Sequence, residues 1–232
     1  MGNKWIQTFK FVYYKMCSAK LKKVKASDGI DALVDFTFSG CWELLKPGQV
    51  AEEIAKLVRL LDETKPKYVL EIGTGRSGGT LFLFSRVAAC DATLVSVDFP
   101  GGKFGDSYPK RKVSFFKSFA QGQQKIHMIR ADSHSPATLE KVKKIFGPNK
   151  LDFLFIDGDH TYEGVKRDFE LYSGLVREGG IIGLHDIVRH PPETGCDVYR
   201  FWNEIEPKYE SIDMVKDWNQ KSCGIGVLKQ KS

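Results

Sequence analysis

Residues 68–80 of the chain read YVLEIGTGRSGGT. An apolar run with β-branched residues, 68–72, breaks into four glycines, and a second apolar run of helical length begins at residue 81. This order predicts a strand, a tight glycine turn and a helix. Glycines suit such a turn because a backbone that approaches a ligand closely, or takes a positive φ, has no room for a Cβ. The turn would bring a ligand to the helix N-terminus, where free N–H groups favour anionic or electron-rich groups.

The glycines fit the pattern G-x-G-x-x-G, which is shared by dinucleotide sites and several other nucleoside-binding turns. Glu71 is costly to bury in an apolar strand without a partner, and a cationic or hydrogen-bond-donating ligand would be one. Asp98 closes the next apolar run, at about the distance where a carboxylate takes ribose hydroxyls. Asp132 could read an adenine amine, or it could cap the helix that begins near Pro136. The predicted cofactor-binding set is Glu71, Gly73, Thr74, Gly75, Ser77, Gly78, Gly79, Asp98, Asp132 and Ser133.

Length and composition predict one main domain. The chain has 232 residues, of which 42% are apolar, enough for one sizeable core with a terminal appendage. We expect a helical appendage over residues 1–45 and the main domain over 46–232. Residues 4–25 have apolar side chains at helical spacing among many lysines. This helix could lie on a membrane surface, or pack on the domain or on a second subunit as a homo-oligomer contact.

The charge pattern does not favour nucleic-acid binding, because much of the net charge of +6 lies in residues 4–25 and the rest is close to balanced. No uncharged stretch approaches the length of a membrane span, and Lys10 and Lys15 interrupt any signal-peptide core. The five cysteines are scattered without C-x-x-C spacing, so neither a disulfide framework nor a zinc site is predicted. A reducing cytosol fits best, and we expect a cytoplasmic protein.

Strand and helix patterns alternate five times along the main domain before a final pair of strands. The expected strands are 68–72, 92–97, 126–129, 151–156, 181–184, 209–215 and 224–228. Gly179-Gly180 is expected to stop the helix before the fifth strand. The pattern predicts an α/β fold: a Rossmann-like, open, mostly parallel seven-stranded sheet with helices on both faces and an antiparallel C-terminal β-hairpin.

Acidic residues follow the ends of five expected strands, where ligands bind in open α/β sheets. These residues are Glu71, Asp98, Asp132, Asp157 and Asp186. Helix capping would explain some of them. It does not account for Asp157 and Asp159 lying two residues apart next to His160, or for His185 beside Asp186.

These features resemble the class I S-adenosylmethionine-dependent methyltransferases. The similarity rests on the E-x-G-x-G-x-x-G turn, the acid that ends the second strand, the Gly-Gly pair and the terminal hairpin. Within that class, residues 156–165 (IDGDHTYEGV) and 179–186 (GGIIGLHD) resemble the macrocin O-methyltransferase and cephalosporin-hydroxylase-like group. The resemblance covers roughly residues 50–228. It implies S-adenosylmethionine as cofactor, a divalent metal ion, and methyl transfer to a hydroxyl of a small or sugar-containing acceptor.

The resemblance also implies roles for individual residues. Asp157 and Asp186 become metal ligands, and His160 becomes the base, although His160 could instead bond the first turn of its own helix. His185 stands where the group often has an acid, and joins the predicted metal set. Because Mg²⁺ prefers oxygen ligands, an imidazole here weakens the case for Mg²⁺ or favours Mn²⁺ or a related ion. A metal ion that contacts the acceptor oxygen would lower the pKa of the acceptor hydroxyl. Asp157 as a ligand of this ion and His160 as the base are the predicted catalytic residues.

Two other functions remain open from the sequence. The glycine pattern alone permits an NAD-dependent oxidoreductase, and a non-catalytic module could retain the nucleoside pocket. Residues 99–109, rich in glycine, proline and aromatics, could be a mobile flap over the site or a plain surface loop. Phe104, Tyr108 and Trp202 are candidates for stacking on an aromatic or sugar acceptor.

Overall fold

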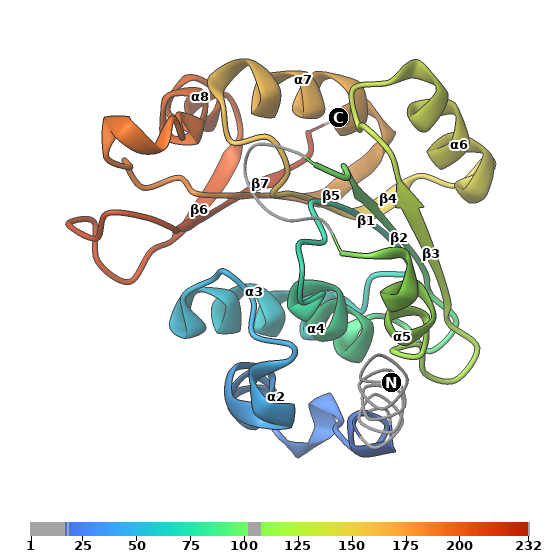
Figure 1. Ribbon diagram of the computed structural model, residues 1–232. Coiled ribbons are helices and arrows are strands. Elements are labelled where there is room, and N and C mark those ends of the chain that lie inside the picture. Colours follow the sequence, from blue (N-terminus) through green and yellow to red (C-terminus); the bar gives the residue numbers. More distant parts are fainter. Residues whose placement is uncertain (1–16, 18, 102–107, 232) are drawn as a thin grey trace, which may run out of the picture.

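The computed structural model describes residue 17, residues 19–101 and residues 108–231 (Figure 1). Its strands are β1 (Tyr68–Ile72), β2 (Thr93–Asp98), β3 (Lys125–Arg130), β4 (Leu151–Ile156), β5 (Val176–His185), β6 (Glu210–Met214) and β7 (Ile225–Lys229). Its α-helices are α2 (Ile30–Ser39), α3 (Ala51–Thr64), α4 (Gly79–Val87), α5 (Val113–Lys117), α6 (Pro136–Phe146), α7 (Tyr162–Tyr172) and α8 (Val198–Ile205). Most of the predicted N-terminal helix and of the predicted flap lies outside the described residues.

The strands form one seven-stranded sheet in the order β3-β2-β1-β4-β5-β7-β6. Strands β1 to β5 are parallel, and β7 pairs antiparallel with both β5 and β6. The predicted fold class, including the C-terminal hairpin at the sheet edge, is confirmed. β4 and β5 are neighbours, so the residues that follow them emerge side by side.

Helices cover both faces of this sheet and bury two apolar layers. α3, α4 and α5 lie on one face, and α6, α7 and α8 lie on the other (Figure 1). The apolar face of α3 shows the cause: Ile54, Leu57 and Leu61 recur at helical spacing and are fully buried. Each such side chain contributes about 1.5–3 kcal/mol through its removal from water. The two helical layers hold the strands rigidly, which fixes the loops at the strand ends.

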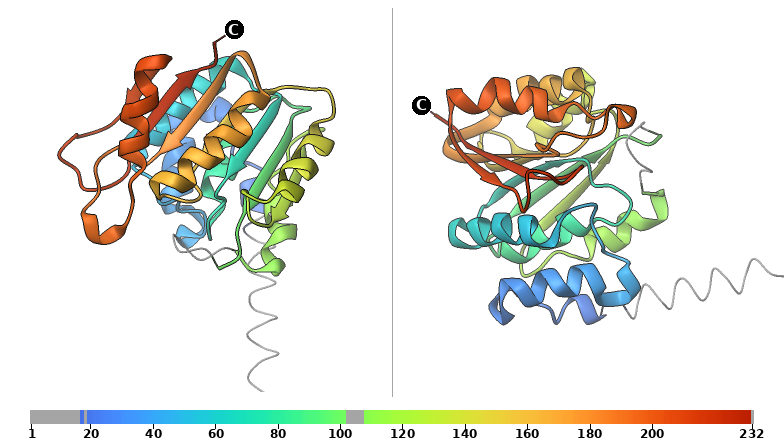
Figure 2. Two further views of the ribbon diagram at one scale, coloured as in Figure 1. Left: turned by 90° about the horizontal axis from the view of Figure 1, so that it is seen from above. Right: turned by 90° about the vertical axis from the view of Figure 1, so that its left-hand side faces the viewer.

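α2 forms an outer layer against α3 and α4 (Figure 2). Leu33 and Val34 from α2, together with Leu45 from the segment that follows, join the same buried cluster as α3 and α4. A domain boundary at residue 45, and an oligomer contact through the N-terminal helix, both stay predictions.

The structure departs from the sequence prediction after α7. This helix, expected to continue to Gly179-Gly180, ends at Tyr172, and Val176 instead begins β5 and pairs with Leu151. Gly179 and Gly180 therefore lie within β5, next to an irregularity in its pairing with β4. The prediction failed because a strand with a local irregularity has no regular apolar alternation to detect.

The aromatic stacking prediction is wrong for two of its three residues. Trp202 is 2% exposed, and its ring lies so close to Gly226 that a Cβ there would clash with it. Tyr108 is fully buried against Phe116. Both rings pack in the apolar core and are therefore not available to stack on an acceptor. Phe104 lies outside the described residues.

Candidate active site

The glycine turn after β1 brings the ends of β1 and β4 into direct contact. Gly73 has φ 93°, and a Cβ at this position would lie 1.9 Å from the carbonyl oxygen of Asp157. No other residue fits there. Gly75 and Gly78 also have positive φ, and Gly78 is the N-cap of α4. The strand, glycine turn and helix predicted from the sequence are confirmed.

Glu71 lies beneath this turn and is fully buried. Its two carboxyl oxygens accept hydrogen bonds from Thr80 Oγ1 and Ser96 Oγ, each at 2.5 Å. Ser96 Oγ also contacts Thr74 Oγ1 in the turn itself. Burial, only partly offset by these hydroxyls, raises the pKa of Glu71 to about 8. Glu71 is thus a mostly neutral group at pH 7 that joins β1, β2, the turn and α4.

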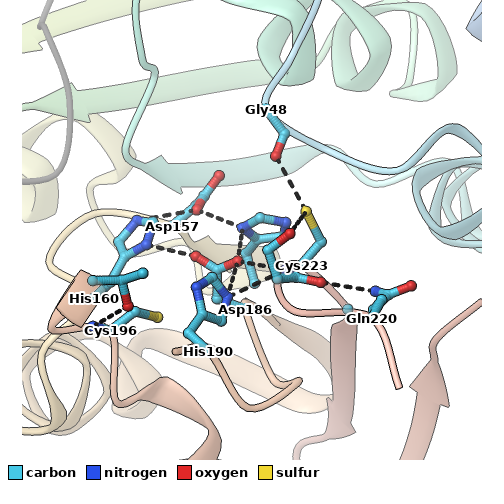
Figure 3. Close-up of polar contacts among 12 residues, drawn as sticks. Gly48, Asp157, His160, Asp186, His190, Cys196, Gln220 and Cys223 are labelled. Carbon is cyan, nitrogen blue, oxygen red and sulfur yellow. Dashed lines mark hydrogen bonds and ion pairs between the residues drawn. The ribbon is translucent and has the colours of Figure 1, made fainter. Parts of the chain in front are cut away.

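The four predicted catalytic and metal residues meet where β4 and β5 end, and Asp157 directly follows β4. Its Oδ1 lies 3.0 Å from His185 Nδ1 and 3.4 Å from His160 Nε2 (Figure 3). Asp186 Oδ2 lies 2.6 Å from His160 Nδ1, and Asp186 Oδ1 lies 3.3 Å from His185 Nδ1. The four side chains predicted from two strand ends therefore form one cluster.

Charge within this cluster is coupled. Burial would lower the pKa of His160, but hydrogen bonds to Asp186 and Cys196 and the charges of both aspartates outweigh it and raise the pKa to about 10. Burial also opposes charge on His185, yet Asp157 and Asp186 hold its pKa well above the usual range. For Asp186, burial is outweighed by His185, His160 and His190, which hold its pKa well below the usual value. The cluster is an ionic network built from imidazolium and carboxylate.

The structure adds residues that the sequence reasoning missed. Gln49 Nε2 donates to Asp157 Oδ2 at 2.9 Å, and its Oε1 is buried without a hydrogen-bond partner among the described residues. His190 Nε2 lies 3.0 Å from Asp186 Oδ1. Cys223 N donates to the same oxygen at 3.0 Å. Nothing in the sequence marks Gln49 or Cys223, whereas His190, four residues after Asp186, is a signal that could have been followed.

The loop that carries Cys223 is held by a buried carboxylate on α3. Glu53 is fully buried, and its oxygens accept from the backbone N–H groups of Lys216 and Gly224 and from Gln220 Nε2, at 2.7–2.9 Å. Cys223 and Asp186 are both non-glycine residues with positive φ, at 68° and 64°. Backbone in this region is costly and persists where its surroundings fix it, as the Glu53 bonds do here.

One cavity of about 730 Å³ joins the glycine turn to the ionic network. The turn contributes Gly73, Thr74, Gly75, Arg76 and Ser77 to its lining, and the network contributes Asp157, His160, His185, Asp186 and His190. Residues 46–49 form another wall, and Lys112 closes the cavity beside the turn. Lys112 Nζ donates to the carbonyl oxygen of Arg76 at 2.5 Å, and burial lowers the pKa of this lysine to about 8.

The remaining predicted cofactor residues do not line this cavity. Asp98 ends β2, beside Arg130 at the end of β3. Asp132 is exposed, and its Oδ1 accepts from the backbone N–H of His134 at 2.9 Å. It does not cap α6, whose N-cap is Ser135. The Ser133 carbonyl accepts from the Tyr172 hydroxyl at 2.7 Å. These residues follow strands on the other side of the turn from the ionic network.

Comparison with known proteins shows the family to which this chain belongs. A family described as "Methyltransferase domain" matches residues 70–187, from β1 to just past Asp186. The chain belongs to this methyltransferase family. The resemblance to class I S-adenosylmethionine-dependent methyltransferases predicted from the sequence is confirmed. The matched residues include the glycine turn and Asp157, His160, His185 and Asp186, and end before His190.

Two curated proteins are similar in sequence to this methyltransferase. It is 28% identical over 173 residues to "Probable caffeoyl-CoA O-methyltransferase 1" of Dictyostelium discoideum, a match that covers 72% of this chain and 66% of that protein. A shorter match, 54% identical over 39 residues, is to "Uncharacterized protein R132" of Acanthamoeba polyphaga mimivirus and covers 17% and 18% of the two chains. The chain thus spans at most about two thirds of the length of these relatives.

Solved methyltransferase structures share the fold. The O-methyltransferase TomG from Streptomyces achromogenes, in complex with SAM, has a TM-score of 0.57 at 15% identity over 88% of this chain and 90% of that chain. The MycE methyltransferase of the mycinamycin pathway, in complex with Mg and SAH, has a TM-score of 0.57 at 17% identity over 87% and 55%. Among the described residues of this methyltransferase, no helix is long and apolar enough to cross a membrane.

Proposed function

We propose that this protein is a metal-assisted, S-adenosylmethionine-dependent O-methyltransferase that acts on a hydroxyl of a small or glycosylated molecule. The observation that carries the proposal is the shared cavity: the glycine turn lines one side of it and the ionic network the other. A cofactor on the turn would direct its methyl group toward an acceptor beside His160. The family match favours methyl transfer over hydride transfer.

The residues of the network fit a divalent ion. Both ring nitrogens of His185 are buried and lack a well-directed hydrogen bond within the described part of the chain, although two carboxylates face the ring. Asp157, His185 and Asp186 would hold the ion, and the imidazole favours Mn²⁺ or a related ion over Mg²⁺. Bound there, the ion would polarise the acceptor hydroxyl and neutralise the carboxylates that keep His160 protonated.

His160 would remove the proton of the acceptor hydroxyl. The sulfonium methyl is already electrophilic, so alignment and proton removal are what the protein must supply. His160 is held on Asp186 at 2.6 Å and lines the cavity. With Asp157 and Asp186 unneutralised its pKa of about 10 makes it an acid, so the proposed base needs these charges offset.

On the cofactor side, the turn from Gly73 to Gly79 would receive the methionine part and Asp98 the ribose, with Asp132 and Ser133 near the adenine. Glu71 would act from beneath, by fixing Thr80 and Ser96 behind the turn. Gln49 Oε1 offers a buried acceptor to a ligand donor in the cavity. Lys112 offers a cation next to the turn, where a carboxylate would be stabilised.

Calorimetry and a transfer assay test the proposal. Titration with S-adenosylmethionine, S-adenosylhomocysteine and NAD should give binding for the first two and none for NAD. Methyl transfer to a panel of phenolic and sugar hydroxyls should stop with chelator and return with Mn²⁺ or Mg²⁺. NAD binding alone would favour an oxidoreductase, and cofactor binding without transfer to any acceptor would favour a non-catalytic module. Full activity after exhaustive chelation would exclude the metal role.

A further inference from the structure

Cys196 brings a thiol to the ionic network from a different element. It lies between the short 3-10 turn Pro192–Thr194 and α8, and its side chain is 5% exposed. Its sulfur lies within 4.8 Å of a ring nitrogen of His160, and burial is outweighed by hydrogen bonding from His160 and His190, which lowers the pKa of the thiol. The neighbouring residue Asp197 is tied to the same histidine, since its backbone N–H donates to the carbonyl oxygen of His160 at 2.8 Å. The segment that carries the thiol is therefore fixed beside His160.

The ligand atoms of His160, Asp186 and Cys196 all lie within 4.8 Å of one another. In a tetrahedral zinc site, with Zn–N and Zn–S bonds of about 2.0–2.3 Å, ligand atoms lie roughly 3.5 Å apart. The three groups thus need only small side-chain movements to surround one ion. We propose that His160, Asp186 and Cys196 form a thiolate-containing site for Zn²⁺, and that Zn²⁺ bound there inhibits methyl transfer.

This site overlaps the one proposed for the catalytic ion only at Asp186. It uses Asp186 Oδ2, which faces His160, whereas Asp186 Oδ1 faces His185 and His190. It uses neither Asp157 nor His185. The ligands also differ in chemistry, because a thiolate selects zinc and other soft or borderline ions and is a poor ligand for Mg²⁺. The C-x-x-C test applied to the sequence missed the site because its ligands come from three separate segments.

Inhibition follows from the shared residues, and this part rests on the proposed function. Zn²⁺ bound to one ring nitrogen of His160 would either occupy the nitrogen that takes the proton of the acceptor hydroxyl or hold the imidazole ring away from that hydroxyl. It would also take one carboxylate from the catalytic ion. On binding, the proton between His160 and Asp186 and the thiol proton leave to solvent, and N–Zn, O–Zn and S–Zn bonds form. His190, in contact with both Asp186 and Cys196, would orient these ligands from outside.

Metal binding is tested on the full-length protein without any acceptor. After chelator treatment and dialysis, titration with Co²⁺ should produce the intense near-ultraviolet thiolate-to-Co²⁺ charge-transfer band, and one equivalent of Zn²⁺ should remove it. Cys196→Ser should abolish the band. Cys223→Ser, at the thiol that lines the cavity, and Cys90→Ser, at an exposed thiol, should keep it. Absence of the band in the wild type, or its loss in Cys223→Ser alone, would overturn the proposal.

A second measurement does not depend on a variant folding. Alkylation of the wild type, read by peptide mass spectrometry, should show Cys196 protected by Zn²⁺ and Cys90 unprotected, and equal labelling of Cys196 with and without Zn²⁺ counts against the site. Where transfer is measurable, Cys196→Ser should raise the half-inhibiting Zn²⁺ concentration, measured against the variant's own zinc-free rate, by at least about tenfold. An unchanged value would refute inhibition through this site. Failure of transfer with every acceptor would leave the Co²⁺ result to decide the site alone.

Discussion

Glu71 lies behind the glycine turn and Asp186 lines the cavity in the ionic network, and these two buried carboxyl groups are in opposite charge states. Glu71 is surrounded by hydroxyls from Thr80 and Ser96, and its pKa is raised to about 8. Asp186 is surrounded by three histidines, and its pKa lies well below its usual value. Burial opposes charge on both. The partners decide the outcome, because two hydroxyls do not offset the cost of removing the Glu71 carboxylate from water, whereas three histidines do so for Asp186.

This difference divides the cavity into a neutral frame and a charged centre. The hydroxyl bonds of Glu71 fix the backbone of the glycine turn without adding a charge beside it. The histidines around Asp186 keep its buried carboxylate ionised, so that this carboxylate can pair with protonated histidines or with a metal ion. We expect substitutions on the two sides to differ in size and in pH dependence.

The largest effect is expected from Asp186→Asn. Removing one partner of a buried ionic network costs about 3–5 kcal/mol in the free energy of unfolding. Divalent-ion binding should be lost while S-adenosylmethionine still binds. Because the pKa of Asp186 is lowered in the folded protein, its contribution to stability is complete above its unfolded pKa of about 3.8. The stability difference between wild type and Asp186→Asn should shrink as pH falls below that value and through the lowered folded pKa. Urea denaturation measures this, with exposed Asp91→Asn as the control; equal stability losses in both would break the comparison.

His160→Ala tests the charged centre by turnover. The variant should keep cofactor and metal but lose turnover by about 10²–10⁴-fold, the usual contribution of a positioned base. His127→Ala, on β3 and outside the cavity lining, is the matched control and should keep wild-type turnover. Undiminished turnover in His160→Ala would leave the ionic network without a base.

Asp98→Ala tests the cofactor side with a smaller effect. Loss of a ribose hydrogen bond to a carboxylate should weaken S-adenosylmethionine binding by about 1–3 kcal/mol, measured by calorimetry. Metal binding should not change, because Asp98 ends β2 and does not line the cavity with the ionic network. Unchanged cofactor affinity in a folded Asp98→Ala protein would refute the ribose assignment.

The smallest effect is expected from Glu71→Gln at a pH below about 4.5. Because Glu71 is neutral there in both the folded and the unfolded protein, an amide of the same shape should change the free energy of unfolding by about 1 kcal/mol or less. The pH dependence has the opposite sign to that of Asp186. A raised pKa contributes stability that is complete below the unfolded value of about 4.5 and is lost as pH rises toward about 8. Wild type should therefore lose stability relative to Glu71→Gln over this range; a constant difference would show that Glu71 is charged.

Local pattern was enough to predict the sheet and most of the site. Strand and helix periodicity predicted seven strands and the terminal hairpin, and both are present. The acids at strand ends could be placed because parallel strands deliver their carboxyl ends to one edge of the sheet. Asp157, His160, His185 and Asp186 meet there because β4 and β5 are neighbours. The strand ends follow from the order of residues along single elements, whereas the pairing of β4 with β5 is a property of the sheet.

Contacts between distant segments were decided by the tertiary structure alone. Gln49, Cys196 and Cys223 reach the network from three loops, and their position depends on how α3, α8 and the β6–β7 hairpin pack. In the sequence Glu53 is an ordinary acid in the first turn of a helix. In the structure it is fully buried and accepts a hydrogen bond from Gly224 N in the loop that carries Cys223. The charge states of Glu71 and Asp186 also follow from their three-dimensional partners, because burial and neighbouring charge, rather than residue type, set a buried carboxyl group's pKa.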